Sequence, residues 1–121
     1  VPAGVPGQYG AVTFDMKAPT RVLVLSDMVT REELEDDREY ADILDDVRYE
    51  MEQHGRVVSV TIPREKEGFS GVAIGRIFVE YADPAQARIA GIALSSKKFG
   101  DKVVQADYYS EESYAARRLA E

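Results

Sequence analysis

The side chains with the clearest chemical potential in this sequence are carboxylates. Eleven of the 22 acidic residues fall within residues 32–52, where only two residues are basic. Asp42, Asp46 and Glu50 are spaced four residues apart, so on a helix they form one stripe along an edge of its apolar face. Glu39, one turn earlier, extends this acidic stripe. Such a stripe is typical either of a solvated helix surface or of a surface that binds a cationic ligand.

Support for catalytic chemistry is weak. The single histidine, His54, falls at a predicted helix end, where a cap or a solvent-exposed side chain is the usual role. Ser26 and Asp27 follow a strand without a positioned base and are typical of a turn. Adjacent acids such as Asp36 and Asp37 point in different directions on a helix. Paired histidines, a phosphate loop and cysteine are all absent from the sequence. We expect no enzyme, no metal and no cofactor.

Length and charge narrow the classes of partner. With 121 residues the chain is long enough for one domain with its own core. A net charge of -7 opposes binding to phosphates and favours a basic partner. No apolar run approaches the roughly 20 residues that span a bilayer, and the N-terminus lacks a signal-peptide pattern. We therefore expect an intracellular domain.

Hydrophobic patterning predicts the order strand, helix, strand, strand, helix, strand, followed by a final helix. The predicted strands are 21–28, 56–63, 72–81 and 101–108, the predicted helices are 30–54, 83–94 and 110–120, and residues 1–19 are predicted to be a linker or arm before a domain over 20–121. Two split crossovers of this kind predict an α+β, ferredoxin-like βαββαβ fold. We expect a four-stranded antiparallel sheet with two helices on one face and an extra C-terminal helix.

The spacing of apolar residues predicts which helix faces are buried. In the first helix the apolar positions recur at intervals of three and four residues: Tyr40, Ile43, Leu44, Val47 and Met51. The second helix begins with Asp83 as N-cap and Pro84 in its first turn. Its predicted inner face contains Ala87, Ala90 and Leu94.

The segment GRIFVEY, residues 75–81, resembles half of the motif with which RNA-recognition domains stack bases. Strand alternation predicts that Arg76 and Phe78 lie on the open side of the sheet, with Leu23 beside them on the first strand. A base platform needs aromatic rings at these three positions, and only Phe78 is aromatic. We expect Phe78 to pack under the final helix and RNA binding to be weak or absent.

Four segments together resemble the U2-auxiliary-factor homology motif (UHM) family: VLVLSDMV, EELEDDREYADILDDVRYE, GRIFVEY and KKFGDKVV. The resemblance covers residues 20–120 and is greatest for the C-terminal domain of the U2 snRNP auxiliary factor large subunit. It implies an RNA-recognition-motif (RRM) fold that binds peptides, in a nuclear splicing protein that acts in 3′ splice-site recognition. The implied partners are basic, tryptophan-containing segments of the branch-point-binding protein and of a large U2 snRNP subunit.

The resemblance also implies which residues bind the peptide. The family signature is Arg-any-Phe, and the matching residues are Lys97, Lys98 and Phe99. The first and last of these would enclose the ligand's tryptophan, although lysine lacks the planar guanidinium that stacks on an indole. The acidic stripe would receive the ligand's basic residues. Two alternatives remain open: an RNA-binding RRM domain with a degenerate platform, and a domain that forms a constitutive dimer.

Overall fold

The computed structural model describes residues 19–26, 28–95, 98–99, 102–103 and 105–120, with the backbone alone at 95, 98–99 and 102–103. A four-stranded antiparallel sheet has the order β2-β3-β1-β6. Its strands are β1 (Val22–Ser26), β2 (Val57–Thr61), β3 (Ile77–Tyr81) and β6 (Gln105–Tyr109). Residues 1–18 of the arm predicted over 1–19 lie outside the described residues, so the boundary between the arm and the domain stays a prediction.

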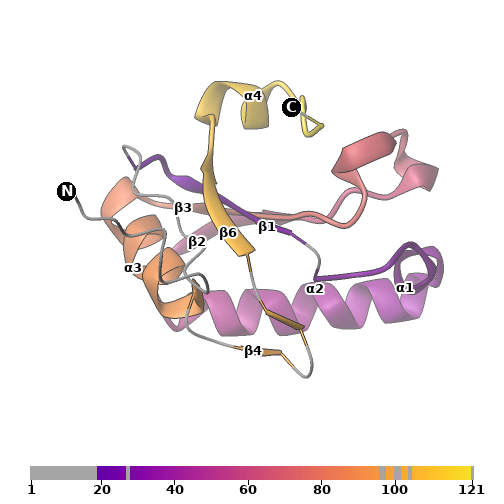
Figure 1. Ribbon diagram of the computed structural model, residues 1–121, viewed down its shortest axis with the longest axis horizontal. Helices are drawn as coiled ribbons and strands as arrows, with labels where there is room; N and C mark the ends of the chain where they lie inside the picture. The colour runs from indigo at the N-terminus through magenta and orange to yellow at the C-terminus, as the bar shows by residue number, and fades with distance from the viewer. Residues whose placement is uncertain (1–18, 27, 96–97, 100–101, 104, 121) are drawn as a thin grey trace.

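The two long helices lie against one face of the sheet, and the C-terminal helix lies on the other (Figure 1). The helices are α1 (Arg31–Glu35), α2 (Asp37–Glu52), α3 (Pro84–Ser95) and α4 (Glu111–Ala115), with 3-10 turns η2 (Glu65–Glu67) and η3 (Gly71–Ala73). A two-stranded hairpin of β4 (Lys98–Phe99) and β5 (Lys102–Val103) precedes β6. The predicted βαββαβ fold is confirmed. None of the described helices is both long and apolar enough to cross a membrane.

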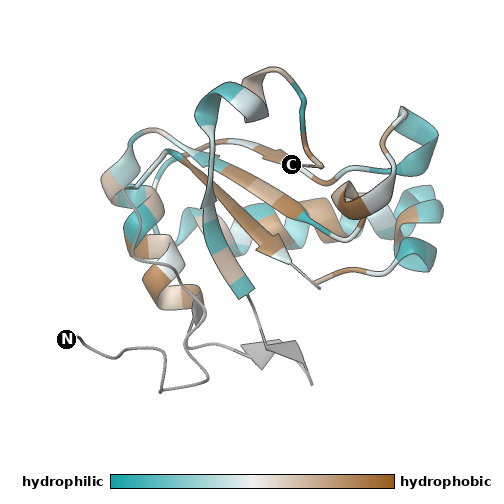
Figure 2. Ribbon diagram, turned by 45° about the horizontal axis from the view of Figure 1, so that its top comes forward, coloured by the Kyte–Doolittle hydropathy of each residue, from teal (hydrophilic) through white to brown (hydrophobic). Residues whose placement is uncertain are grey.

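The apolar helix faces pack as their spacing predicts. Val47 and Met51 of α2 are buried, and the other three predicted positions of that face are partly buried against the same core. The inner face of α3 is fully buried at all three predicted positions. Asp83 caps α3, because its Oδ1 accepts a hydrogen bond from Gln86 N at 3.0 Å. The strands in the middle of the sheet, against which these helices pack, are apolar and appear brown in Figure 2.

The predicted orientation of Leu23 is wrong. Leu23 is fully buried in the core between the sheet and the long helices, whereas Val22 and Val24 face the opposite side. The strand register explains this, since Val24 lies opposite Phe78 on β3 and directly opposed residues point to the same face. Leu23 is therefore not a position of the open sheet face.

The single helix predicted over 30–54 is two helices. Asp36 breaks it with an extended backbone, φ -86° and ψ 118°, and caps α2 by accepting hydrogen bonds from Arg38 N and Glu39 N. The third strand begins at Ile77 rather than residue 72, and the final helix ends at Ala115. The hairpin of β4 and β5 was not predicted. The sequence therefore identified the type of each main element more accurately than its ends.

Candidate functional site

A pocket of about 270 Å³ opens between α2 and the segment that follows β1. Its walls are mostly apolar and carry three carboxylates, and its lining residues are Met28, Val29, Glu33, Ile43, Asp46, Val47, Glu50, Met51 and Ile77. Because α2 presents its apolar face to the sheet, the edge of that face forms one wall. The pocket can therefore accept an apolar side chain whose neighbours are positively charged.

The structure brings two residues of the acidic stripe to this pocket. Asp46 is exposed and Glu50 partly buried, and both line the pocket. Asp42 and Glu39 are exposed on α2 and do not line it. The stripe thus begins on the open helix surface and ends at the pocket.

Glu50 lies at the more enclosed end of the site. Its Oε2 is 3.7 Å from Nε2 of His54, one turn further along the chain. The hydroxyl of Tyr81, on β3, donates to the carbonyl oxygen of Met51 at 2.8 Å. Burial, with a smaller contribution from the Glu50 carboxylate, raises the pKa of Tyr81 far above its ordinary value. The Tyr81 hydroxyl therefore remains neutral and serves as a structural donor.

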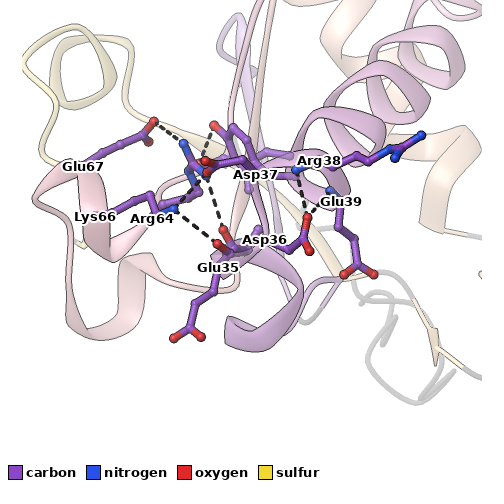
Figure 3. Close-up of polar contacts among 11 residues, drawn as sticks. Glu35, Asp36, Asp37, Arg38, Glu39, Arg64, Lys66 and Glu67 are labelled. Atoms are coloured by element: carbon purple, nitrogen blue, oxygen red, sulfur yellow. Dashed lines mark hydrogen bonds and ion pairs between the residues drawn. The ribbon is translucent and has the colours of Figure 1, made fainter.

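A polar network holds the first turn of α2 in place (Figure 3). Asp37 Oδ1 accepts from Arg64 Nη1 at 2.8 Å and from Lys66 Nζ at 2.9 Å. Hydrogen bonds from Lys66 and then Arg64 lower the pKa of Asp37. The Arg64 guanidinium also lies 3.8 Å from the ring centroid of Tyr40, and its Nη2 donates to Glu67. These contacts tie α2 to the loop between β2 and β3.

Sequence reasoning missed the wall of the pocket opposite α2. Met28 and Val29 come from the segment after β1, and Glu33 comes from α1. The Glu33 side chain accepts a hydrogen bond from Thr30 N in the capping box of α1, and this bond fixes the orientation of the carboxylate. Ile77 lies between Arg76 and Phe78, so strand alternation puts it on the helix side of the sheet, but no pattern in the sequence indicates that it lines a pocket. The only indication of this wall in the sequence is that two apolar residues, Met28 and Val29, follow the polar residues that end the first strand.

Two of the three predicted signature residues, Lys98 and Phe99, form β4. Lys98 pairs with Val103, and Phe99 pairs with Lys102. Lys97 and the side chains of Lys98 and Phe99 lie outside the described residues, so their place in the site stays a prediction. Figure 1 shows the hairpin on the helix side of the sheet. Within the described residues, no group of three or more His, Cys, Asp or Glu side chains is placed to hold a metal ion.

Comparison with known proteins relates the chain to splicing factors. No protein-family model matches it. A splicing factor U2af large subunit of Oryza sativa subsp. japonica is 38% identical over 99 residues, which cover 81% of this chain and 18% of that protein. Its counterpart in Triticum aestivum is 41% identical over 98 residues, which cover 80% and 18%. The chain is related to U2af large subunits. It spans about a fifth or less of their length.

Solved structures agree on the fold of this U2af-related chain. The structure of the RNA15 RRM gives a TM-score of 0.51 and covers 80% of this chain and 98% of that one. The Rna15 RRM with bound RNA (GU) gives 0.50, with 83% and 97% covered. Both are 18% identical in sequence, so this likeness shows the RRM fold alone.

In this U2af-related RRM domain the open sheet face is covered. Phe78 is fully buried, with its ring centroid 4.9 Å from that of Tyr109 and 5.9 Å from that of Tyr114. Arg76 Nη1 donates to the carbonyl oxygen of Leu119 at 2.9 Å. The expectation that Phe78 packs under the final helix is confirmed. Its ring is not available for base stacking while α4 is in place.

Proposed function

We propose that this chain is a non-catalytic, peptide-binding adaptor domain of a splicing factor that acts in 3′ splice-site recognition in the nucleus. Its ligand is a basic segment with one tryptophan. The observation that carries the proposal is the apolar pocket with Asp46 and Glu50 on its rim, at the end of the acidic stripe. The relation to U2af large subunits, which are named splicing factors, supports the biological setting.

The chemistry of the pocket fits such a ligand. An aromatic side chain that leaves water buries about 150–250 Å² of surface, so a single tryptophan supplies much of the binding energy of a short peptide. The carboxylates at the rim then receive the neighbouring arginines or lysines. The net charge of -7 raises the rate at which a cationic segment meets the surface.

The proposed partners are the tryptophan-containing basic segments of the branch-point-binding protein and of a large U2 snRNP subunit. Phe99 and Lys97 enclose the tryptophan, with Lys98 between them in the signature. A lysine at the first position makes a cation contact with the indole but cannot stack on it as arginine does. This substitution predicts weaker binding than an arginine would give.

The alternative, an RNA-binding RRM domain, has less support from the geometry. It requires an accessible sheet face, and here Phe78 lies under α4 with none of its surface exposed. The solved RRM with bound RNA shares the fold at 18% identity, which does not extend to its ligand.

Titration with a basic, single-tryptophan peptide tests the proposal. The chain contains no tryptophan, so indole emission reports the peptide alone. We expect the emission to shift to shorter wavelength on binding, as the indole leaves water. A matched peptide with alanine in place of tryptophan, followed by calorimetry, should bind far more weakly. Equal affinity of the two peptides would contradict the proposed pocket.

A further inference from the structure

A groove of about 380 Å³ lies on the α4 side of the sheet, away from the peptide pocket. It opens between the loop that joins β2 to β3 and the segment that follows α4 (Figure 1). Its apolar lining belongs to the side-chain cluster on that face of the sheet and consists of Phe69, Ala73 and Leu119. Its charged lining consists of two exposed arginines, Arg117 and Arg118. Within the described part of the chain, no carboxylate lines this site, which we call the arginine groove.

The arginine groove keeps its positive charge because the carboxylates of the neighbouring turn η2 pair elsewhere. Glu65 Oε1 lies 3.4 Å from Arg31 Nε. Glu67 Oε2 lies 3.2 Å from Arg64 Nη2. Arg76, whose Nη1 donates to the backbone at one wall of the groove, adds a third positive charge. The acidic stripe of α2 lies on the opposite face of the sheet, and charges more than about 8 Å apart are largely screened at physiological salt. The groove is therefore a locally positive surface in a chain whose net charge is -7.

Arg117 has an unusual backbone conformation at the edge of this groove. Apart from glycines, it alone among the described residues has a positive φ, of 62°. The turn closes α4, since Arg117 N donates to Tyr114 O at 3.0 Å and Arg118 N donates to Ser113 O at 2.8 Å. Glycine is the usual residue at this position of such a turn. The Arg117 guanidinium lies 5.5 Å from the ring centroid of Tyr114, and its Nη1 donates to Thr61 Oγ1 at 3.2 Å. A strained position thus carries a held guanidinium, and strained residues cluster at ligand sites.

We propose that the arginine groove binds an acidic peptide segment with one apolar side chain. Arginine donates paired hydrogen bonds to carboxylates, and two arginines line the groove. The apolar side chain of the ligand leaves water against Phe69 and Leu119. A nucleic acid would also offer negative charge, but its bases lack a platform because Phe78 is buried. The inference is independent of the proposed function, since no residue lines both the groove and the pocket. The chain can therefore hold a basic and an acidic segment at once.

Titration with an acidic peptide tests the inference. The probe is a peptide with blocked ends in which Asp and Glu residues flank one tryptophan, and its indole emission is read without interference because the chain contains no tryptophan. We expect the emission to shift to shorter wavelength and the affinity to fall as salt is raised. Arg117→Gly with Arg118→Gln should weaken binding at least about tenfold. Glycine adopts the left-handed conformation readily, so α4 should stay in place by circular dichroism. Arg56→Gln with Arg88→Gln removes the same charge from exposed positions outside the groove and should change the affinity far less.

A second variant and the location of the bound peptide complete the test. Arg118→Gln alone, which leaves the backbone turn at Arg117 unchanged, should give part of the loss. Backbone amide resonances should shift on binding at residues 68–73 and 117–120, with small shifts along α2. Shifts concentrated at the α2 pocket would overturn the inference, as would equal losses in the two double variants or no binding by the wild-type chain. Single-stranded RNA that binds through Arg117 and Arg118, where the acidic peptide does not, would overturn it in favour of a phosphate site.

Discussion

The two carboxylates at the pocket rim are the residues that most directly test the site. Reversing both, as Asp46→Lys with Glu50→Lys, should weaken a basic tryptophan peptide at least about tenfold, or 1.4 kcal/mol. The reason is that both side chains line the pocket where the ligand's cations would lie. Indole emission measures the affinity, and circular dichroism checks that the helix persists.

The matched control changes the same total charge elsewhere on α2. Asp45 and Glu52 are exposed and do not line the pocket, and the Glu52 contact with Arg48, at 3.7 Å, is a surface ion pair of small energetic value. Asp45→Lys with Glu52→Lys should therefore cost much less affinity. Long-range attraction fades beyond about 8 Å at physiological salt, so we expect the loss of overall acidity alone to have a small effect. Equal losses in the two double variants would mean that overall acidity, and not the position of the carboxylates, is the cause.

Phe99 is the proposed aromatic wall for the ligand's tryptophan. Phe99→Ala should weaken the peptide by about 2 to 4 kcal/mol, since truncation at the centre of an interface has effects of that size. The fold should survive by circular dichroism. The control is Phe69→Ala, whose ring packs against the cluster on the other face of the sheet. Unchanged binding by Phe99→Ala would mean that this ring only anchors the hairpin.

For single residues, the sequence predicted the orientation of a side chain correctly where local spacing alone decides it. Asp46 and Glu50 could be placed beside the apolar face of one helix because that relation is local. Leu23 could not be placed, because VLVL is apolar on both sides and its orientation depends on pairing with β3. Met28 joins the pocket through a tertiary contact that no local pattern contains.

Among the elements, α4 is held to the sheet by side-chain hydrogen bonds that the sequence did not indicate. The Tyr114 hydroxyl lies 2.7 Å from Ser59 Oγ and 2.8 Å from Thr61 Oγ1, both on β2. Tyr114→Phe should lower the free energy of unfolding by about 1 to 2 kcal/mol, because it leaves these partly buried hydroxyls without that partner. Chemical denaturation measures the change. Tyr49→Phe is the control, since the Tyr49 side chain is 70% exposed on α2 and should change stability little.

Element ends depended on backbone features that apolar patterning does not contain. The predicted helix over 30–54 breaks because the side chain of Asp36 binds the backbone N–H groups that follow it. The predicted strand over 72–81 loses its first half to turns in which Gly71 and Gly75 have φ values of 65° and 101°. Neither feature involves an apolar residue, so a prediction based on apolar patterning did not detect these ends.

The proposed ligand pocket and the sheet face covered by α4 lie on opposite sides of the molecule. The pocket opens beside α2, under the sheet, whereas α4 lies across the other face (Figure 1). Tyr109 and Leu119 complete the cluster that encloses Phe78. A peptide can therefore occupy the pocket without moving α4, whereas a base that stacks on Phe78 requires α4 to leave.

The whole chain should therefore bind polyuridine negligibly at physiological salt. Two physical effects act together: the net charge of -7 opposes the counterion release that drives binding to single strands, and the ring of Phe78, on the sheet face where RRM domains stack bases, is buried. Fluorescence anisotropy of labelled RNA measures this, with the basic peptide as positive control on the same sample. Micromolar RNA affinity would contradict the adaptor role. If Tyr114→Phe then strengthened that affinity, the cause would be displacement of α4, because this variant loosens the helix without adding charge or a stacking ring.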